Sequence, residues 1–395
     1  MEYRIPSFNC AAASATHCPG QGNKASAQRA LNIALVAEQR SSFLQDGYSE
    51  EDCAALTHEG EVRAVASTLN QLGHHVTLIQ GIQALVQHLA SGNYKPWDMV
   101  FNMAQGFHGT ARESQVPALL EAYRIPYTFA DAATMALCQN KAYTKAVLQH
   151  HHIPTSPFLV LPTKASASSL PESTSQLPSY PLFLKPVTEG SSKGISTFNK
   201  AAKPAELEMA VQKLRAKFPG QDILVESFLP GREYTVSILG TGAASRVIGV
   251  REHIWQGGAK MNGSTNGDTY GSHHPVGLDF ACCESKSSTA GRRLSWNDHH
   301  DMSDPEVQAA CQVSLAAWKI LGCRDAGRVD LRFDSLEPNA VPNVLEVNPI
   351  SGLLPAHSPL PASAESNGIS FEQLLARIVE SALQRAQEDG EIQVN

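Results

Sequence analysis

Short apolar runs, typical of buried strands, alternate along the first third of the chain with segments in which apolar residues recur at helical spacing. The predicted strands are 32–37, 75–79 and 98–102, and the predicted helices are 62–72, 82–89 and 116–123. Gly73 stands where the first of these helices should end. Alternation of strands and helices predicts a doubly wound parallel sheet, so the fold class is α/β.

A second unit begins near Ala130. Its predicted helices are 134–151 and 205–218, and its predicted strands are 181–186 and 223–229. Two segments are expected to form loops because of their composition: the Ser/Pro-rich segment 165–179 and the Gly/Ser segment 189–194.

In a third unit the predicted strands come in pairs, 233–239 with 246–251 and 328–333 with 341–347. The predicted helices there are 305–321 and an amphipathic closing helix, 370–387. Between these elements we expect a long mobile loop over 257–277 and a surface insertion over 282–303.

The chain has 395 residues, enough for two or three domains. We expect domains over 31–129, 130–228 and 229–387, preceded by a flexible tail over 1–30. No secretory signal is expected in that tail, because it lacks a basic flank followed by an apolar run; organelle targeting is the alternative.

Composition and charge exclude several classes of protein. An apolar fraction of 42% excludes wholesale disorder. A net charge of −7 argues against a nucleic-acid partner, and no run approaches the length of a membrane span. The eight cysteines lack CxxC spacing and are too few for a disulfide scaffold. These features favour a reduced, cytoplasmic protein.

Arg328, Asp330, Glu346 and Asn348 form the strongest local constellation. Residues two apart in a strand face the same side, so pairing of the two strands would bring three oxygen-bearing side chains together beside one guanidinium. Asp, Glu and Asn oxygens are the ligands that Mg²⁺ prefers, and substrate phosphates complete its shell. The alternative is a pair of solvated strand faces joined by a salt bridge.

A Gly/Ser loop and two lysines point to a phosphate site. Gly190 and Gly194 allow the chain to approach a ligand closely, and neighbouring amides and hydroxyls can cradle a phosphate. Lys141 and Lys185 are flanked by apolar residues, so buried stems would direct both ammonium groups toward an anion. The alternatives are a plain turn and lysines that extend to solvent.

The apolar run 225–229 leads into a Gly-containing turn that ends at Glu233. Backbone groups and a carboxylate at such a junction can hydrogen-bond a purine and a ribose, and the junction can serve as a hinge between domains. An ordinary strand-to-turn junction is the alternative.

Taken in order, a series of short motifs resembles the ATP-grasp superfamily and, within it, the D-alanine–D-alanine ligases. The motifs are Phe101–Gly106, Arg112–Glu121, Ile125–Thr128, Asn140–Lys141, Leu184–Pro186, Glu189–Gly194, Val225–Glu226, Pro230–Glu233, Gly327–Asp330 and Glu346–Pro349. The resemblance covers about residues 95–385. It implies a three-domain ATP-grasp fold with an N-terminal substrate domain, a small α+β lid domain and a C-terminal α+β catalytic domain.

The resemblance implies roles in nucleotide binding. Lys141 and Lys185 would hold the phosphates of ATP, and Lys260 in the long loop would reach the γ-phosphate. The lid over the phosphates would consist of Glu189, Gly190, Ser191, Ser192 and Gly194, with Ser191 also serving in catalysis. The base and ribose would be held by Glu226, the backbone near Leu229, and Glu233.

It also implies roles in the chemistry. Asp330, Glu346 and Asn348 would hold two Mg²⁺ ions, for which Mn²⁺ can substitute, and Arg328 would face the developing oxyanion. A carboxylate is a poor acyl donor, so ATP converts it to an acyl phosphate that an amine then attacks. Positive charge on the transferring phosphoryl group and on the oxyanion lowers both barriers, and a closing loop keeps water out.

Departures from the family pattern gather where the amino acids would bind. Only Glu38 is recognisable in place of the usual N-terminal loop of glycines and a Glu. Residues 104–107 replace a His-Gly turn, and Gly352 follows Ser where the family has Pro-Gly. Ser358 lies one residue beyond the place of the serine that grips the second carboxylate, and His357 occupies that place.

The sequence therefore predicts an ATP-dependent ligase that joins two amino acids, most similar to D-alanine–D-alanine ligase. One alternative is a relative that ligates other amino acids in specialised metabolism. Another is a nucleotide-binding regulatory homologue that has lost ligation, against which the complete metal set argues. The resemblance also implies a homodimer, with small-molecule partners rather than nucleic acid or membrane.

Overall fold

The computed structural model describes residues 29–163, 177–255, 280, 294–388 and 390. Except for residues 29 and 30, these belong to one compact unit, Leu31–Asn395. Three predictions fall largely or wholly outside the described residues: the tail over 1–30, the Ser/Pro-rich loop, and the long loop with Lys260.

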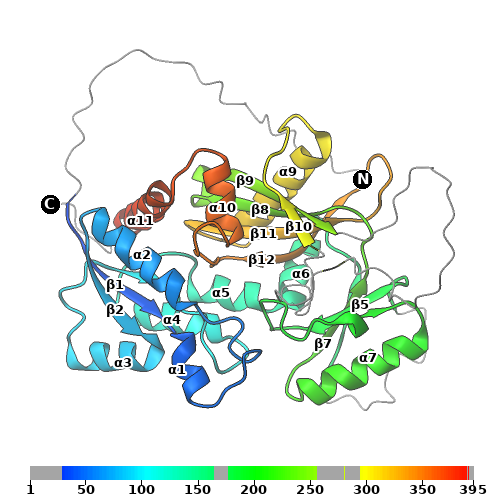
Figure 1. The fold of residues 1–395 in the computed structure, drawn as a ribbon, viewed down its shortest axis with the longest axis horizontal. Coiled ribbons are helices and arrows are strands. Elements are labelled where there is room, and N and C mark those ends of the chain that lie inside the picture. The colour runs from blue at the N-terminus through cyan, green and yellow to red at the C-terminus, as the bar shows by residue number, and fades with distance from the viewer. Residues whose placement is uncertain (1–28, 164–176, 256–279, 281–293, 389, 391–395) are drawn as a thin grey trace, which may run out of the picture. The chain divides into compact units, whose positions relative to one another are not determined.

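The N-terminal sheet is parallel and carries helices on both faces. Its strands are β1 (Asn32–Ala37), β2 (His75–Gln80) and β3 (Met99–Asn102), in the order β2-β1-β3. Alternate residues of β1 pack into the hydrophobic cores on opposite faces of the sheet. Ile33 and Leu35 pack with α2 (Glu59–Gln71), whereas Ala34 and Val36 pack with α3 (Gly81–Ser91) and α4 (Gln115–Ala122) (Figure 1). The predicted doubly wound sheet is confirmed; α1 (Arg40–Gln45), which buries no residue, was missed.

The central sheet is antiparallel and has the order β4-β7-β5-β6. Its strands are β4 (Phe158–Leu161), β5 (Leu182–Pro186), β6 (Lys200–Ala201) and β7 (Ile223–Ser227). Helix α7 (Pro204–Lys217) covers it with Leu207, Val211 and Leu214, which meet Leu184 and Val225 of the sheet (Figure 1). Strand β4 was not predicted, because its four residues follow a Pro-rich break.

The C-terminal sheet is antiparallel, in the order β10-β9-β8-β11-β12. Its strands are β8 (Glu233–Leu239), β9 (Arg246–Trp255), β10 (Leu294–Asn297), β11 (Ala326–Phe333) and β12 (Pro342–Asn348). Helix α9 (Pro305–Ile320) packs on one face through Trp318, while α10 (Pro359–Ser366) and α11 (Phe371–Glu388) share a core with the N-terminal sheet. Strand β10 lies within the predicted surface insertion 282–303 and pairs with β9 at the edge of the sheet; residues 282–293 of that insertion lie outside the described residues.

The predicted helix 134–151 is wrong: two helices, α5 (Ala132–Gln139) and α6 (Lys141–His150), take its place. Asn140 between them has extended backbone angles, φ −91° and ψ 97°, and its side chain accepts hydrogen bonds from the amides of Ala142 and Tyr143. This is the geometry of an N-cap. The cap places Lys141 at the first residue of α6, where it faces the site described below.

A buried ion pair ties the N-terminal and C-terminal sheets together. Arg385 of α11 donates to Asp325 Oδ2 (3.0 Å) and to the carbonyl of Tyr127 (2.8 Å). Asp325 also accepts hydrogen bonds from the Phe129 amide (2.7 Å) and the Ser381 hydroxyl (2.9 Å). Each of the three sheets falls inside one predicted domain. None of the described helices is long and apolar enough to span a membrane.

Short 3₁₀ helices complete the described elements; their bounds are Arg112–Ser114, Thr197–Asn199 and Gly242–Ala244. The first of them leads into α4 and contributes Glu113 to the site.

Candidate active site

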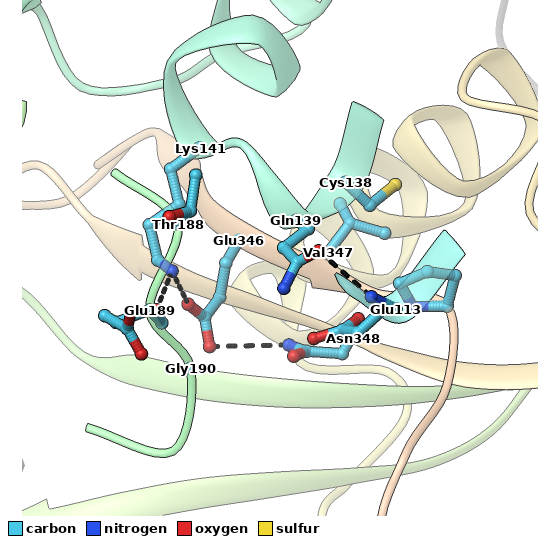
Figure 2. A pocket seen from close by; sticks show the side chains of 11 residues that line it. Glu113, Cys138, Gln139, Lys141, Thr188, Glu189, Gly190, Glu346, Val347 and Asn348 are labelled. Atoms are coloured by element: carbon cyan, nitrogen blue, oxygen red, sulfur yellow. Dashed lines mark hydrogen bonds and ion pairs between the residues drawn. The ribbon is translucent and has the colours of Figure 1, made fainter. Parts of the chain in front are cut away.

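The predicted pairing of strands β11 and β12 is confirmed, and the two strands are antiparallel. Arg328 lies opposite Asn348, and Asp330 lies opposite Glu346. Arg328 Nη1 is 3.0 Å from Asp330 Oδ2, and the Asn348 amide donates to Asp330 Oδ2 (3.1 Å) and to Glu346 Oε1 (3.4 Å). The Thr235 hydroxyl of β8 holds the other Asp330 oxygen at 2.6 Å. The four predicted side chains therefore form one cluster (Figure 2 shows Glu346 beside Asn348).

The two carboxylates of this cluster sit in unlike environments. Burial raises the pKa of Asp330 to about 6, against the charge of Arg328 and with the help of the Glu346 charge. Burial also acts to raise the pKa of Glu346, but the charges of Lys141, Arg328 and Lys185 outweigh it and hold that pKa well below its ordinary value. The cluster thus keeps one firmly ionised carboxylate next to one that a cation would help to ionise.

The donor set fits a hard divalent cation. Asp330 and Glu346 supply carboxylate oxygens, and turning the Asn348 amide presents its oxygen to the same point. Among the residues that the structure describes, no three His, Cys, Asp or Glu side chains lie close enough to hold a metal alone. The site therefore suits Mg²⁺ that takes its remaining ligands from phosphates, and it does not suit a closed structural zinc.

Lys141 links this cluster to the Gly/Ser loop. Its ammonium donates to the carbonyl of Glu189 (2.5 Å) and lies 3.4 Å from Glu346 Oε2, as Figure 2 shows. Its backbone amide donates to Val187, directly after β5. The side chain is nearly buried, so its charge points into the site rather than to solvent.

A small cavity of about 30 Å³ opens between Lys141, Glu189, Glu346 and Glu113. Gln139 also lines it, and the Gln139 Nε2 amide has no hydrogen-bond partner among the described residues. Burial raises the pKa of Glu113 to about 7, although Arg112 and Lys141 oppose the rise. An unpaired amide donor and a lysine at one cavity suit an anionic ligand.

The loop over this cavity is held in an unusual backbone conformation. Ser191 and Ser192 have positive φ angles of 52° and 62°, and Gly194 has φ 79°. A Cβ atom on Gly194 would lie 2.5 Å from the Phe218 ring, so only glycine fits there. Non-glycine residues in this region carry strain, a feature that concentrates at ligand clamps.

Glu226 is buried between two lysines. Its carboxylate lies 2.8 Å from Lys145 Nζ and 2.7 Å from Lys185 Nζ, and it accepts a hydrogen bond from the Ser156 hydroxyl (2.8 Å). Burial acts to raise the pKa of Glu226, but the charges of Lys145 and Lys185 hold it at about 2. Lys185 therefore contacts Glu226 in this structure, and it also lies close enough to lower the pKa of Glu346.

The chain beyond Glu226 forms an apolar corner with one acidic side chain. Leu229 is buried, and the Phe228 ring packs near those of Phe183 and Phe280. Glu233 accepts a hydrogen bond from Arg332 (3.2 Å). The corner places apolar side chains next to the carboxylates of Glu226 and Glu233, a combination that suits a base and a sugar.

Glu38 lies at the carboxyl end of β1 and is 4% exposed. One of its oxygens accepts from the Gln105 amide (2.8 Å), while Oε1 has no partner among the described residues. Burial raises the pKa of Glu38. The unpaired oxygen is free to accept a donor from a ligand.

Gly352 and Ser358 lie together after β12. A Cβ atom on Gly352 would be 2.8 Å from the Ser358 hydroxyl, which accepts from the Leu354 amide at 3.2 Å. Glu61 of α2 joins them and accepts from the Leu353 amide (2.5 Å). Gly352 and Ser358, both at positions where the sequence departs from the family pattern, are thus adjacent.

A larger cavity of about 390 Å³ borders the end of the altered turn 104–107. Phe107 lines it and stacks on Phe43 at 4.5 Å between ring centroids. Ion pairs join its rims, Lys193 to Asp52 at 3.7 Å and Lys217 to Glu51 at 2.5 Å. These residues bring the Gly/Ser loop and α7 against the segment after α1.

The structure brings Lys141, Arg328, Asp330, Glu346 and Asn348 together and Lys185 against Glu226, whereas Glu38, Glu233, and Gly352 with Ser358 lie in separate contacts. Lys260 lies outside the described residues. Residues that the sequence analysis left without a role are Glu61, Glu113, Gln139, Lys145 and Thr235. The one sequence feature that could have identified Lys145 is its position one helical turn after Lys141, which places both side chains on the same face of the helix.

Comparison with known proteins finds D-alanine–D-alanine ligases among the similar sequences and structures. A sequence model described as "D-ala D-ala ligase C-terminus" matches residues 147–266 and 279–380. A D-alanine–D-alanine ligase of Xanthomonas axonopodis pv. citri is 29% identical over 344 residues, 87% of this chain and 95% of the relative. D-alanine–D-alanine ligase B of Xanthomonas campestris is 31% identical over 345 residues, and this match also covers 87% of this chain and 95% of the relative.

A solved structure has the same fold. The D-alanine–D-alanine ligase of Bacillus anthracis, in complex with ATP, superimposes with a TM-score of 0.66 at 18% sequence identity. The match covers 91% of this chain and all of that one.

Proposed function

The chain belongs to the D-alanine–D-alanine ligase family, and from this premise we propose that it uses ATP and Mg²⁺ to join the carboxyl group of one amino acid to the amine of a second. One observation carries the proposal. Asp330, Glu346 and Asn348 converge on one face of paired strands, with Lys141 and Arg328 beside them. A protein that merely bound a nucleotide would not need this complete set.

We assign the nucleotide to the space between the central and C-terminal sheets. Lys141 and Lys185 hold its phosphates, and the loop 189–194 closes over them. Glu226 and the Leu229 backbone hold adenine, and Glu233 holds the ribose. The buried ammonium groups and the apolar corner at Leu229 support this assignment.

Asp330, Glu346 and Asn348 would hold two Mg²⁺ ions, with Mn²⁺ as a substitute. The bound cation would neutralise the negative charge on the phosphates while that charge is redistributed during phosphoryl transfer. Arg328 lies beside the same cluster, so its guanidinium can stabilise the negative charge that develops on the oxygen of the acyl carbon.

The reaction then has two steps. A carboxylate oxygen of the first amino acid attacks the γ-phosphorus of ATP, and ADP leaves. The amine of the second amino acid attacks the acyl carbon, loses a proton and displaces phosphate. Lys141 and Ser191 orient the transferring group, and the closed loop excludes water, which would otherwise hydrolyse the acyl phosphate. Lys260 is proposed to reach the γ-phosphate in this closed state.

The amino acids would bind at the two remaining clusters. Glu38, with its unpaired oxygen, suits the ammonium of the first amino acid. Gly352 and Ser358 suit the carboxylate of the second. D-Alanine is the first candidate for both, and a relative that ligates other amino acids is the second candidate, favoured by the aromatic pair Phe43–Phe107 at the altered turn.

Phosphate release from ATP, measured first without an amino acid and then with a panel of D- and L-amino acids, tests the proposal. We expect turnover only with matching amino acids, and a dipeptide mass for the product. Turnover that no amino acid raises would contradict ligation and favour a regulatory homologue. We further propose that the reaction takes place in the cytoplasm and that the enzyme is a homodimer, which sedimentation equilibrium tests.

A further inference from the structure

Lys145 lies on α6, one turn after Lys141, and its side chain is 1% exposed. Its ammonium contacts the Glu226 carboxylate (2.8 Å) and the hydroxyls of Thr155 (2.6 Å) and Ser156 (2.9 Å). An ammonium has three hydrogen-bond donors, and these three partners engage all of them. Lys145 is therefore fixed in place, with no donor left for a ligand.

Glu226 has a second lysine partner whose position is less constrained. Lys185 contacts the other carboxylate oxygen at 2.7 Å, and its charge also reaches Glu346 at the metal cluster. Holding phosphates would draw the Lys185 ammonium away from Glu226. Without Lys145, Glu226 would then have no lysine in contact. A buried carboxylate in that state takes up a proton, and it no longer accepts hydrogen bonds with both oxygens.

We propose that Lys145 is a positioning residue for base recognition, because it keeps Glu226 charged and oriented to accept a hydrogen bond from an exocyclic amine of the nucleotide base. The inference rests on the proposed function, since it places the base at Glu226. Each carboxylate oxygen has two lone pairs. Among the described residues, Oε2 accepts from Lys145 and Ser156, whereas Oε1 contacts Lys185 alone. One acceptor position on Oε1 is left for the base.

The same network fixes Glu226 relative to the strand that carries the metal residues. The Thr155 hydroxyl donates to the carbonyl of Val344 (2.8 Å), and the Val344 amide donates to the carbonyl of Pro154 (2.9 Å). Val344 lies on β12, two residues before Glu346. Lys145 thus positions the base end of the site without touching the reacting atoms.

Lys145→Met removes the ammonium and keeps most of the stem. Steady-state phosphate release with ATP and with ITP, whose base presents an oxygen in place of the amine, measures the effect. We expect the KM for ATP to rise about tenfold, kcat to change less than about threefold, and the preference for ATP over ITP in kcat/KM to fall by about tenfold. Lys319→Met, at an exposed lysine of α9, is the control for the loss of one charge.

A loss of kcat with unchanged KM and unchanged base preference would overturn the inference, because it would indicate a structural role only. Glu226→Gln should itself abolish the preference for ATP, and adding Lys145→Met should lower it no further. Additive losses would also overturn the inference. Where Lys145→Met does not fold, Lys145→Gln takes its place, since it keeps an amide donor for the neighbouring hydroxyls while Lys185 still balances the charge of Glu226, and the same rise in KM and loss of base preference are expected of it.

The two proposals fail in different ways. Wild-type protein that shows no ATP-dependent turnover would contradict the proposed function. Wild-type turnover together with an unchanged KM and base preference in Lys145→Met would contradict only the role of Lys145.

Discussion

Glu113 gives a pH-dependent test of the site electrostatics. Its pKa rises from 4.5 to about 7 on folding, mainly through burial. Because the folded pKa is the higher one, folding is favoured while Glu113 is protonated, and that advantage is lost as the pH rises from 4.5 through 7. At about 1.4 kcal/mol per pKa unit, the full shift would lower the free energy of unfolding by about 3 kcal/mol above pH 7. The side chain is only half-buried, so we expect a cost of about 1–2 kcal/mol.

Glu113→Gln removes this titration. The variant should gain stability relative to wild type as the pH rises from 5 to 8, by about 1–2 kcal/mol, and the gain should level off above pH 7. Urea denaturation of the chain without nucleotide, at several pH values and with EDTA present, measures it. Glu208→Gln, at an exposed position of α7, is the matched control. A stability difference that stays constant with pH would refute the reasoning.

Two further changes test the ion pair between the N-terminal and C-terminal sheets and the loop 189–194 over the phosphates. Asp325→Asn leaves Arg385 without its buried counter-charge and should lower the free energy of unfolding by about 3 kcal/mol in urea denaturation, whereas a loss below about 0.5 kcal/mol would count against the ion pair. Gly194→Ala places a Cβ atom 2.5 Å from the Phe218 ring and should raise the KM for ATP about tenfold in the phosphate-release assay. Gly220→Ala, where a Cβ atom meets nothing within 4 Å, should leave that KM unchanged, and equal effects of the two changes would contradict a tight loop.

The local residue pattern was enough to predict β11 and β12, the two strands that carry the proposed metal ligands. Alternation along 328–333 and 341–347 predicted which side chains share a face within each strand. The register that sets Asp330 opposite Glu346, with a bulge directly after Asp330, does not follow from alternation. The break in the helix 134–151 was missed because neither Gly nor Pro marks it. Asn140 ends one helix and caps the next through its side chain, a competition that periodicity does not reveal.

The parts of the site that escaped prediction depend on contacts between distant segments. Lys145 gains its importance from Glu226, about 80 residues further along the chain, and Glu61 from the loop after β12. The Lys193–Asp52 contact likewise joins the Gly/Ser loop to the segment after α1. In each case the residue alone looks like an ordinary charged position, and only the fold supplies its partner.

The account depends most on Glu346 as a ligand of the cation that carries the nucleotide. Mg²⁺-dependent phosphate release by Glu346→Gln, compared with Glu337→Gln at an exposed position, tests this most directly. The account predicts a loss on the order of 100-fold or more for Glu346→Gln, with an unchanged circular dichroism spectrum, and wild-type turnover for the control. Turnover of folded Glu346→Gln within about twofold of wild type would contradict the claim.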